Sequence, residues 1–411
     1  MKLFSMETLR KFQQRNSGGA GMVGGSGVTG GSNTFVKTTQ TGYGTRLGNS
    51  IKGIGFGLLL FFGSFVLLYW NEGRVDLSTV ADDAVQADAA ELSSELDGKQ
   101  VFVTSEIAAD GGPIGDQLFL LEGDYMALNR NVEMYAWVQH TSSSSDTNLG
   151  GSETTTTEYS YKQEWVSSTS VPDSSQFEMT GYSNPSPKYT SESFYADGGK
   201  IGVYGIALDE IELPEFKKLT LNEENFRSDG LAQLKAGYAY VDYSANGSDV
   251  PELGDLRVSY EVIEPGMKAT VFGKLEGSDI VTFVDSENDG AKIYRMFKGS
   301  RDEAIATFHD EHVFMTWVLR GVGFLMMWFG LSSVFSVLSV LLDVLPFLGS
   351  VSRGILGLIT FLVAAVLSAA TILISMILHN VIAVVVTVLV VIGITVFVLK
   401  KKGNKPTVVK A

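Results

Sequence analysis

The decapeptide LLYWNEGRVD, residues 67–76, ends a long apolar run on a compact group of polar side chains. Tyr69 and Trp70 are of the aromatic types that gather at a membrane–water interface. Gly73 suits the left-handed residue that follows a helix C-terminus, and Arg74 favours the negative end of the helix dipole. The sequence therefore predicts that a membrane helix leaves the bilayer here and that a polar domain follows it.

Four apolar stretches approach or exceed the roughly 18–20 residues that cross a hydrocarbon core as a helix. They cover residues 53–70, 314–342, 354–378 and 381–399. His379 and Asn380 alone separate the last two stretches, which predicts a tight helical hairpin capped by these residues. Pro346 follows the second stretch and is expected to end it, because proline cannot continue helical hydrogen bonding. A buried core helix is the alternative interpretation of each stretch, above all of the short, glycine-rich first one.

The charge is divided between the apolar stretches and the long segment that separates the first two. Residues 71–313 hold 44 of the 46 acidic residues and 17 of the 31 basic ones, a net charge of −27, whereas the rest of the chain has a net charge of +12. Basic residues beside membrane spans mark the cytoplasmic side. The tails 1–52 and 400–411 are basic and the loop 343–353 carries Arg353, so both termini are expected in the cytoplasm.

Four crossings then place the acidic segment 71–313 in the periplasm, the lumen or the exterior, with the first span acting as an uncleaved signal anchor. The basic, Gly/Ser-rich segment 1–52 is predicted to be a flexible cytoplasmic tail, because residues 17–32 read SGGAGMVGGSGVTGGS. No nucleotide-binding pattern follows from these glycines, because neither the P-loop lysine nor a preceding strand is present.

Residues 71–313 carry β-branched and aromatic runs that alternate apolar and polar positions, as half-buried strands do. The runs cover residues 101–107, 132–139, 159–168, 200–208, 237–244, 256–263 and 268–275. The Ser/Thr-rich stretch 141–158 predicts a mobile hairpin tip, and short helices are expected at 78–96 and 301–313. The predicted fold class is a helical membrane protein with four transmembrane helices and a large, predominantly β (α+β) extracytoplasmic domain inserted between the first and second helices.

Several strings, in this order along the chain, resemble the transmembrane protein 43 (LUMA) family. They are NEGR (71–74), RNVEMYAW (130–137), EYSYKQEW (158–165), NPSP (184–187), ESF (192–194), GDLRVSY (254–260), TWVLRGVGFLMMWFGL (316–331), and Asp343 with Pro346. The resemblance extends from residue 71 to about residue 378.

The resemblance implies four spans with the large domain outside the cytoplasm. It also implies residence in the endoplasmic reticulum and inner nuclear membrane if the source is eukaryotic, with self-association and contacts to lamina-linked membrane proteins. A prokaryotic member would lie in the cell (inner) membrane. A channel activity has been proposed for the family, and the resemblance brings no catalytic motif or cofactor. The Gly/Ser-rich tail and the strongly acidic domain distinguish this chain from the family pattern.

Two patterns could hold a metal ion. His309 and His312 form an H-x-x-H whose histidines share a helix face, but the pattern is not H-E-x-x-H, and a polar turn beside the membrane is the simpler interpretation. DSENDG at 285–290 resembles the start of a calcium loop, but Met296 occupies the twelfth position, where a bidentate glutamate belongs. A surface turn is therefore favoured there.

Enzymatic and nucleic-acid functions find little support in the composition. The chain contains no cysteine, which excludes disulfides, thiol catalysis and cysteine-based metal sites. No G-x-S-x-G occurs, and His140 is the one histidine of segment 71–313 that lies away from the predicted membrane. A hydrolase at the membrane surface would have to use His309 or His312. The net charge of −27 repels nucleic-acid phosphates.

Arg320 is the single charge inside the four apolar stretches. In the four-span topology it lies at the same, non-cytoplasmic face as Glu72, and opposite charges near hydrocarbon tend to pair. We therefore predict a structural clamp formed by Glu72, Arg74 and Arg320, with Glu72 and Arg320 in contact. Independent solvation of these charges is the alternative.

The predicted function is that of a non-enzymatic, multi-pass membrane scaffold that acts through self-association and partner binding by its extracytoplasmic domain. The expected partners are the lipid bilayer, further copies of the chain and other membrane proteins. A channel or transport subunit is the alternative, although small residues on the third span, such as Ala364 and Ser368, favour close helix packing over a wide pore.

Overall fold

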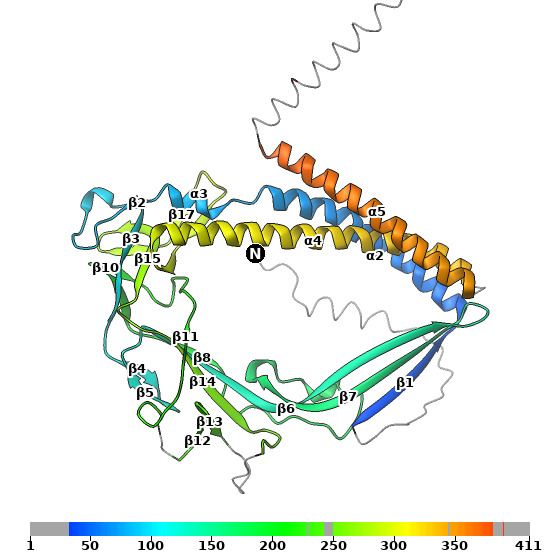
Figure 1. The fold of residues 1–411 in the computed structure, drawn as a ribbon, viewed down its shortest axis with the longest axis horizontal. Coiled ribbons are helices and arrows are strands. Elements are labelled where there is room, and N and C mark those ends of the chain that lie inside the picture. Colours follow the sequence, from blue (N-terminus) through cyan, green and yellow to red (C-terminus); the bar gives the residue numbers. More distant parts are fainter. Residues whose placement is uncertain (1–32, 228–229, 242–249, 344–345, 381–388, 390–411) are drawn as a thin grey trace, which may run out of the picture.

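The computed structural model describes residues 33–227, 230–241, 250–343, 346–380 and 389. Three parts make up the described chain: a layer of long helices and two β-sheets that form one domain (Figure 1). The helix layer lies along one side of the molecule, and the domain contacts it near one end. A long β-hairpin leaves the domain and reaches the opposite end of the helices (Figure 1).

The first sheet has eight strands in the order β1-β7-β6-β14-β13-β12, with β8 beside β6 and β11 beside β14. The bounds are β1 (Thr34–Thr41), β6 (Ala127–Thr147), β7 (Glu153–Ser167), β8 (Glu192–Tyr195), β11 (Lys217–Leu219), β12 (Gln233–Lys235), β13 (Tyr238–Val241) and β14 (Leu256–Ile263). Alternating residues of β6 and β14, among them Val132, Met134, Val258 and Tyr260, form its buried core. Strand β14 matches the predicted run 256–263 at both ends.

β6 and β7 pair from Glu133–Ser167 to Thr147–Glu153, so the turn of this hairpin covers only residues 148–152. The predicted mobile tip 141–158 is thus mostly regular strand. β1 joins β7 in an antiparallel register that runs from Thr34–Ser160 to Thr41–Glu153. The prediction that all of 1–52 is a flexible tail is wrong for residues 34–41, since the threonine-rich TFVKTTQT has the β-propensity to add a strand.

The second sheet contains five strands whose pairings close into a small barrel: β3 (Gln100–Asp110), β9 (Gly198–Ile201), β10 (Tyr204–Ile206), β16 (Asp279–Val281) and β15 (Lys268–Glu276). β2 (Val85–Gln86) lies beside β3, and β19 (Arg295–Lys298) beside β15. Val103, Ile201 and Val271 belong to its core. The predicted single strand 200–208 is two strands, because Gly202 adopts a positive φ of 59° and turns the chain.

Smaller elements surround the two sheets: α3 (Leu77–Asp82), η1 (Ser94–Leu96), β4 (Ile114–Asp116), β5 (Leu120–Gly123), η2 (Ser168–Ser170), η3 (Ser174–Gln176), β17 (Phe283–Asp285) and β18 (Ala291–Ile293). Of the helix predicted at 78–96, only residues 78–82 are α-helical, and Ser94–Leu96 form one 3₁₀ turn. The buried Ala84 and Ala87 flank β2 instead, and its pairing with β3 uses backbone groups that a helix would consume.

Three long helices form the helix layer: α2 (Tyr43–Glu72), α4 (Arg301–Leu342) and α5 (Pro346–Leu378). Each of these three helices is long and apolar enough to cross a membrane. α2 begins ten residues before the predicted 53–70. The expected helix 301–313 and the span 314–342 are one continuous helix of 42 residues. Pro346 starts α5, a position where proline is favoured because its absent N–H would have no intrahelical partner.

The large β-rich domain and the membrane helices 53–70, 314–342 and 354–378 agree with the predicted fold class. The fourth predicted span, 381–399, and the tail 400–411 lie outside the described residues apart from residue 389.

Candidate functional site

Glycines let α2 and α4 approach closely in the helix layer. A Cβ on Gly330 would lie 2.7 Å from the Gly57 carbonyl oxygen and 2.7 Å from the Phe61 nitrogen. Leu68, Met327 and Ala364 are fully buried where α2, α4 and α5 meet. Close helix packing therefore involves small residues of α2 and α4 as well as those predicted on α5.

The last turn of α2 is held to α4 by two neighbouring side chains. Glu72 accepts two hydrogen bonds from Arg320, at 2.8 Å from Nε and 2.7 Å from Nη2. The side chain of Glu72 is 4% exposed and that of Arg320 is 14% exposed. Asn71, also buried, donates from Nδ2 to the Thr316 carbonyl oxygen at 3.1 Å. Such a bidentate pair, removed from water, fixes the relative position of the two helices.

The structure thus brings Glu72 and Arg320 together, whereas Arg74 lies outside this pair. The guanidinium of Arg74 lies 6.0 Å from the centre of the Trp70 ring, and Arg320 packs over the ring of Trp317 at 4.8 Å. Cation–π contacts of this kind place each arginine beside an interfacial aromatic ring. Arg74 therefore lies beside the Glu72–Arg320 pair and is not part of it.

Gly73 ends α2 with a φ of −98°, so the left-handed conformation expected from its sequence position is wrong. Its lack of a side chain serves close approach: a Cβ on Gly73 would overlap the His379 ring at the end of α5. His379 also packs on Tyr69, with ring centres 4.5 Å apart, and its Nδ1 lies 2.9 Å from the Ser375 carbonyl oxygen. The end of α5 therefore packs against the end of α2.

His309 connects α4 to the first residues of the domain. Its Nδ1 lies 2.9 Å from Asp76 Oδ2. Partial burial acts to raise the pKa of Asp76, but hydrogen bonds from Ser78 and His309 outweigh burial and lower this pKa below its usual range. The described residues, His309 and His312 among them, hold no group of three metal-ligating side chains. The H-x-x-H pattern thus contributes a hydrogen bond between α4 and the start of the domain.

The DSENDG stretch forms the turn between β17 and β18. The Asp285 carboxylate accepts bonds from the backbone of Glu287 at 2.9 Å and from the Asn288 side chain at 2.7 Å. The hydrogen bond from the Asn288 side chain has the largest effect, and together these bonds lower the pKa of Asp285. Met296, at the twelfth position of the calcium pattern, is fully buried in the domain core. This geometry is that of an Asx turn.

His140 lies on the β6–β7 hairpin with its Nε2 2.9 Å from Glu164 Oε1. Both side chains are exposed to solvent, which is the setting of a surface ion pair.

A second ionic cluster, which the sequence reasoning missed, lies at the opposite end of α2 and α4. Arg46 contacts Asp343 at 2.6 Å, Glu153 at 2.8 Å and the Gly151 carbonyl oxygen at 2.6 Å. The Arg46 side chain is 8% exposed, and that of Asp343 is fully buried. Asp343 is the only acidic residue after residue 313, and this isolation was the signal that could have identified it.

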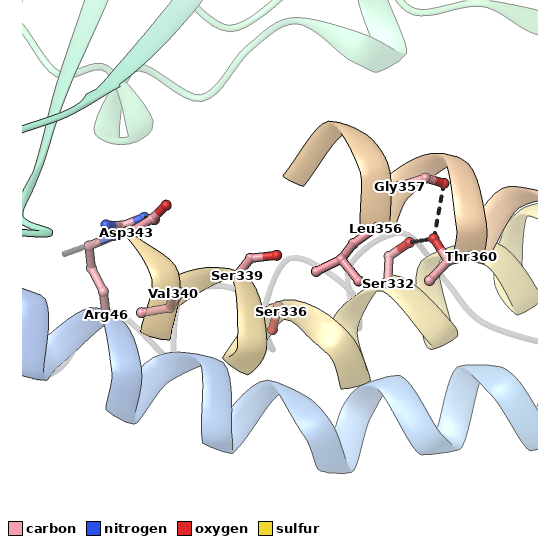
Figure 2. Close-up of a pocket in the computed structure, with 9 residues that line it drawn as sticks. All are labelled: Arg46, Ser332, Ser336, Ser339, Val340, Asp343, Leu356, Gly357 and Thr360. Carbon is pink, nitrogen blue, oxygen red and sulfur yellow. Dashed lines mark hydrogen bonds and ion pairs between the residues drawn. The ribbon is translucent and has the colours of Figure 1, made fainter. Parts of the chain in front are cut away.

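A cavity of about 240 Å³ lies beside this second cluster, between α4 and α5 (Figure 2). Its lining includes the hydroxyl groups of Ser332, Ser336, Ser339 and Thr360. Ser332 and Thr360 are 2.9 Å apart, and Thr360 donates to the Gly357 carbonyl oxygen at 3.1 Å. The cavity thus joins a buried ion pair to a short series of hydroxyls within an apolar helix layer.

Comparison with known proteins supports the family resemblance. The family model for Transmembrane protein 43 matches residues 134–381. A Transmembrane protein 43 homolog of Drosophila melanogaster is 30% identical over 71% of this chain and 79% of its own length. Transmembrane protein 43 of Homo sapiens is 27% identical over 82% of this chain and 87% of its own length, and that of Mus musculus is 25% identical over 81% and 86%.

No solved structure matches the chain. The family model covers more than half of the sequence, and each homologue aligns with this chain over most of the length of both sequences. The apolar helices identify an integral membrane protein. The chain belongs to the transmembrane protein 43 family.

Proposed function

We propose that this chain is a non-enzymatic membrane scaffold that holds its β-rich domain rigidly on a helical anchor. The observation that carries this proposal is the bidentate contact of Glu72 with Arg320, made where both helices leave the domain. A rigid mount keeps the binding surfaces of a domain at a fixed height and orientation over the membrane, as a scaffold requires.

The continuity of α4 supports the same proposal. A capping box of Ser300 and Glu303 starts α4 inside the domain. Phe308 of α4 then packs on Phe297, with ring centres 4.6 Å apart, in the cluster that also holds Phe272. Helix α4 therefore belongs both to the domain core and to the helix layer, and no linker separates the two parts.

Self-association is the second element of the proposal. β1 is the terminal strand of its sheet as described, and an unpaired strand edge is a ready site for a strand from another chain. A further copy of the chain or another membrane protein could add a strand there. We place the protein in the cell membrane of a prokaryote, or in the endoplasmic reticulum and inner nuclear membrane of a eukaryote.

The mass of the purified full-length protein in detergent or nanodiscs tests self-association. Light scattering corrected for bound lipid should give a multiple of the chain mass of 44.4 kDa. A single-chain mass at micromolar concentration and in native lipids would contradict the oligomeric scaffold.

The hydroxyl-lined cavity favours a channel or transport subunit as the second candidate. Polar groups inside an apolar helix layer are the usual marks of a pathway. Planar bilayers containing the purified protein should show selective currents if this candidate is correct, and Ser332→Ala with Thr360→Val should change them. Absence of currents from protein of verified oligomeric state favours the scaffold.

A further inference from the structure

The cavity between α4 and α5 lies beside the last three turns of α4, at the opposite end from the capping box that starts this helix (Figure 2). Its lining on α4 extends from Ser332 to Asp343, a distance of about 16 Å along a helix. The hydrocarbon core that a membrane helix crosses is about 30 Å thick. The cavity therefore starts where α4 ends and reaches well into the hydrocarbon.

One wall of the cavity carries hydroxyl groups. Ser332, Ser336 and Ser339 recur at intervals of three or four residues, so they share one face of α4. Ser332 bonds with Thr360 at 2.9 Å, and Ser336 donates to the Ser333 carbonyl oxygen at 2.7 Å. Ser339 is only 7% exposed, and its hydroxyl has no hydrogen-bond partner within the described residues. A ligand group that bonds with this hydroxyl would remove the cost of leaving it unpaired.

The two charged residues of the lining are paired with each other. Arg46 Nη2 lies 2.6 Å from Asp343 Oδ2, and both side chains are buried. The cavity wall thus offers no unpaired charge to a ligand. An ionic ligand would be buried there without an opposite charge, which is strongly unfavourable. The lining therefore favours an uncharged ligand.

The other wall and the rim of the cavity are apolar. Val340 and Leu356 belong to the lining, and the cavity is partly open rather than enclosed. Exposed apolar side chains lie next to the lining residues in the sequence: Phe335, Leu338, Ile355 and Ile359. In helices that cross a membrane, such side chains face the lipid tails. A molecule therefore enters this cavity from the bilayer.

The volume of the cavity is sufficient for part of a lipid. It is about 240 Å³, whereas an apolar cavity of about 150 Å³ already admits benzene. Apolar walls with a small number of placed polar groups are typical of sites that bind small organic molecules. Size and lining together fit a molecule with one polar, uncharged end and a hydrocarbon body.

We propose that this cavity binds an uncharged lipid with a free hydroxyl group, such as a diacylglycerol or a sterol. The lipid hydroxyl bonds with Ser339. The hydrocarbon part lies against Leu356 and the apolar rim and continues into the bilayer. A lipid in this position obstructs an ion path along the cavity, so the inference goes beyond the scaffold proposal and opposes the channel candidate.

Photoactivatable analogues of a diacylglycerol and of a sterol test the proposal with the full-length protein in nanodiscs. At least one analogue should label the peptides of α4 and α5 that line the cavity, and the analogue that does so identifies the lipid class. The same lipid without the photoreactive group should compete. A phosphatidylcholine with the same acyl chains should not compete, because its headgroup is charged and has no free hydroxyl. Equal competition by the phosphatidylcholine, or no labelling by either analogue, overturns the proposal.

Three variants decide whether Ser339 holds the lipid. Ser339→Ala should weaken binding about three- to tenfold, the equivalent of one hydrogen bond, whereas Ser339→Thr keeps a hydroxyl and should retain binding. Ser368→Ala is the matched control, because Ser368 is a buried serine of the helix layer that contacts Met327 and does not line the cavity. It should bind the lipid as the wild type does.

Unchanged binding by Ser339→Ala, or equal losses in Ser339→Ala and Ser368→Ala, overturns the proposal. The chain mass that tests self-association does not depend on either result, so the lipid site and the scaffold can fail separately.

Discussion

At the scale of single residues, the contact between Glu72 and Arg320 is the interaction on which the proposed rigid mount depends. Each charge is largely removed from water and has the other as its ionic partner. Removal of one partner from such a pair costs more than the pair contributes, because the remaining charge is buried without compensation.

We therefore expect Glu72→Gln and Arg320→Gln each to lower the free energy of unfolding by about 3 kcal/mol. The double variant should lose clearly less than the sum of the two, because it removes both charges. Equilibrium unfolding in mixed micelles measures all three. Arg74→Gln is the control and should cost at most about 1 kcal/mol, since it removes only a cation–π contact. If the losses of the two single variants added up to that of the double variant, Glu72 and Arg320 would not be coupled energetically.

The lowered pKa of Asp76 predicts that the folded protein loses stability in acid. Its pKa in the folded state is lowered because hydrogen bonds from Ser78 and His309 outweigh the opposing effect of burial. A carboxyl with a lowered folded-state pKa contributes stability above its unfolded pKa of about 3.9, and this stability is lost as the pH falls through the folded value.

The melting temperature of the wild-type protein should therefore decrease more between pH 5 and pH 2.5 than that of Asp76→Asn. Thermal unfolding of both proteins in the same detergent measures the difference. Parallel curves over this range would contradict the role assigned to Asp76.

At the scale of elements, periodicity and charge located the long strands β3, β6, β7, β14 and β15 and the three described apolar helices. The run 256–263 coincides with β14, because alternate buried residues give a strand an unambiguous pattern. The pairing of Glu72 with Arg320 followed from one isolated charge in an apolar run. β1 could not be found, because a short threonine-rich run becomes a strand only when a partner strand binds it. The Arg46 cluster depends on that pairing and was missed with it.

The contact between α2 and α4 predicts different effects for two glycines of the same helix. A Cβ on Gly330 would meet the backbone of α2, which cannot move aside, whereas one on Gly321 would meet no atom within 4 Å. Gly330→Ala should therefore destabilise the helix layer by about 1–3 kcal/mol. Gly321→Ala should be neutral or stabilising by up to about 1 kcal/mol, because alanine is the better helix former. Unfolding in mixed micelles compares the two, and equal effects would contradict the close approach at Gly330.

At the scale of the whole molecule, the helix layer and the ribbon formed by β1 and residues 139–147 and 153–161 are joined at both ends, so neither can move far without the other (Figure 1). The junction near Glu72 comes from chain connectivity and one bidentate pair. The junction at Arg46 joins residues far apart in the sequence: one arginine contacts Asp343, Glu153 and the Gly151 carbonyl oxygen. Because Arg46 connects three segments, its removal affects order well beyond its own position.

Arg46→Met removes the cation that contacts Asp343 and Glu153, and we expect the free energy of unfolding to fall by about 3 kcal/mol, as for other broken buried pairs. Amide hydrogen exchange should become faster in β1 and in the first turns of α2, because the junction no longer holds the ribbon tip. Exchange in the domain core, including β14, should stay unchanged. Lys37→Met is the matched control: it removes a basic residue of the same ribbon whose partner Glu178 is exposed, so it should cost at most about 1 kcal/mol. Faster exchange throughout the domain, or an unchanged exchange rate in β1, would show that Arg46 does not hold the ribbon to the helix layer.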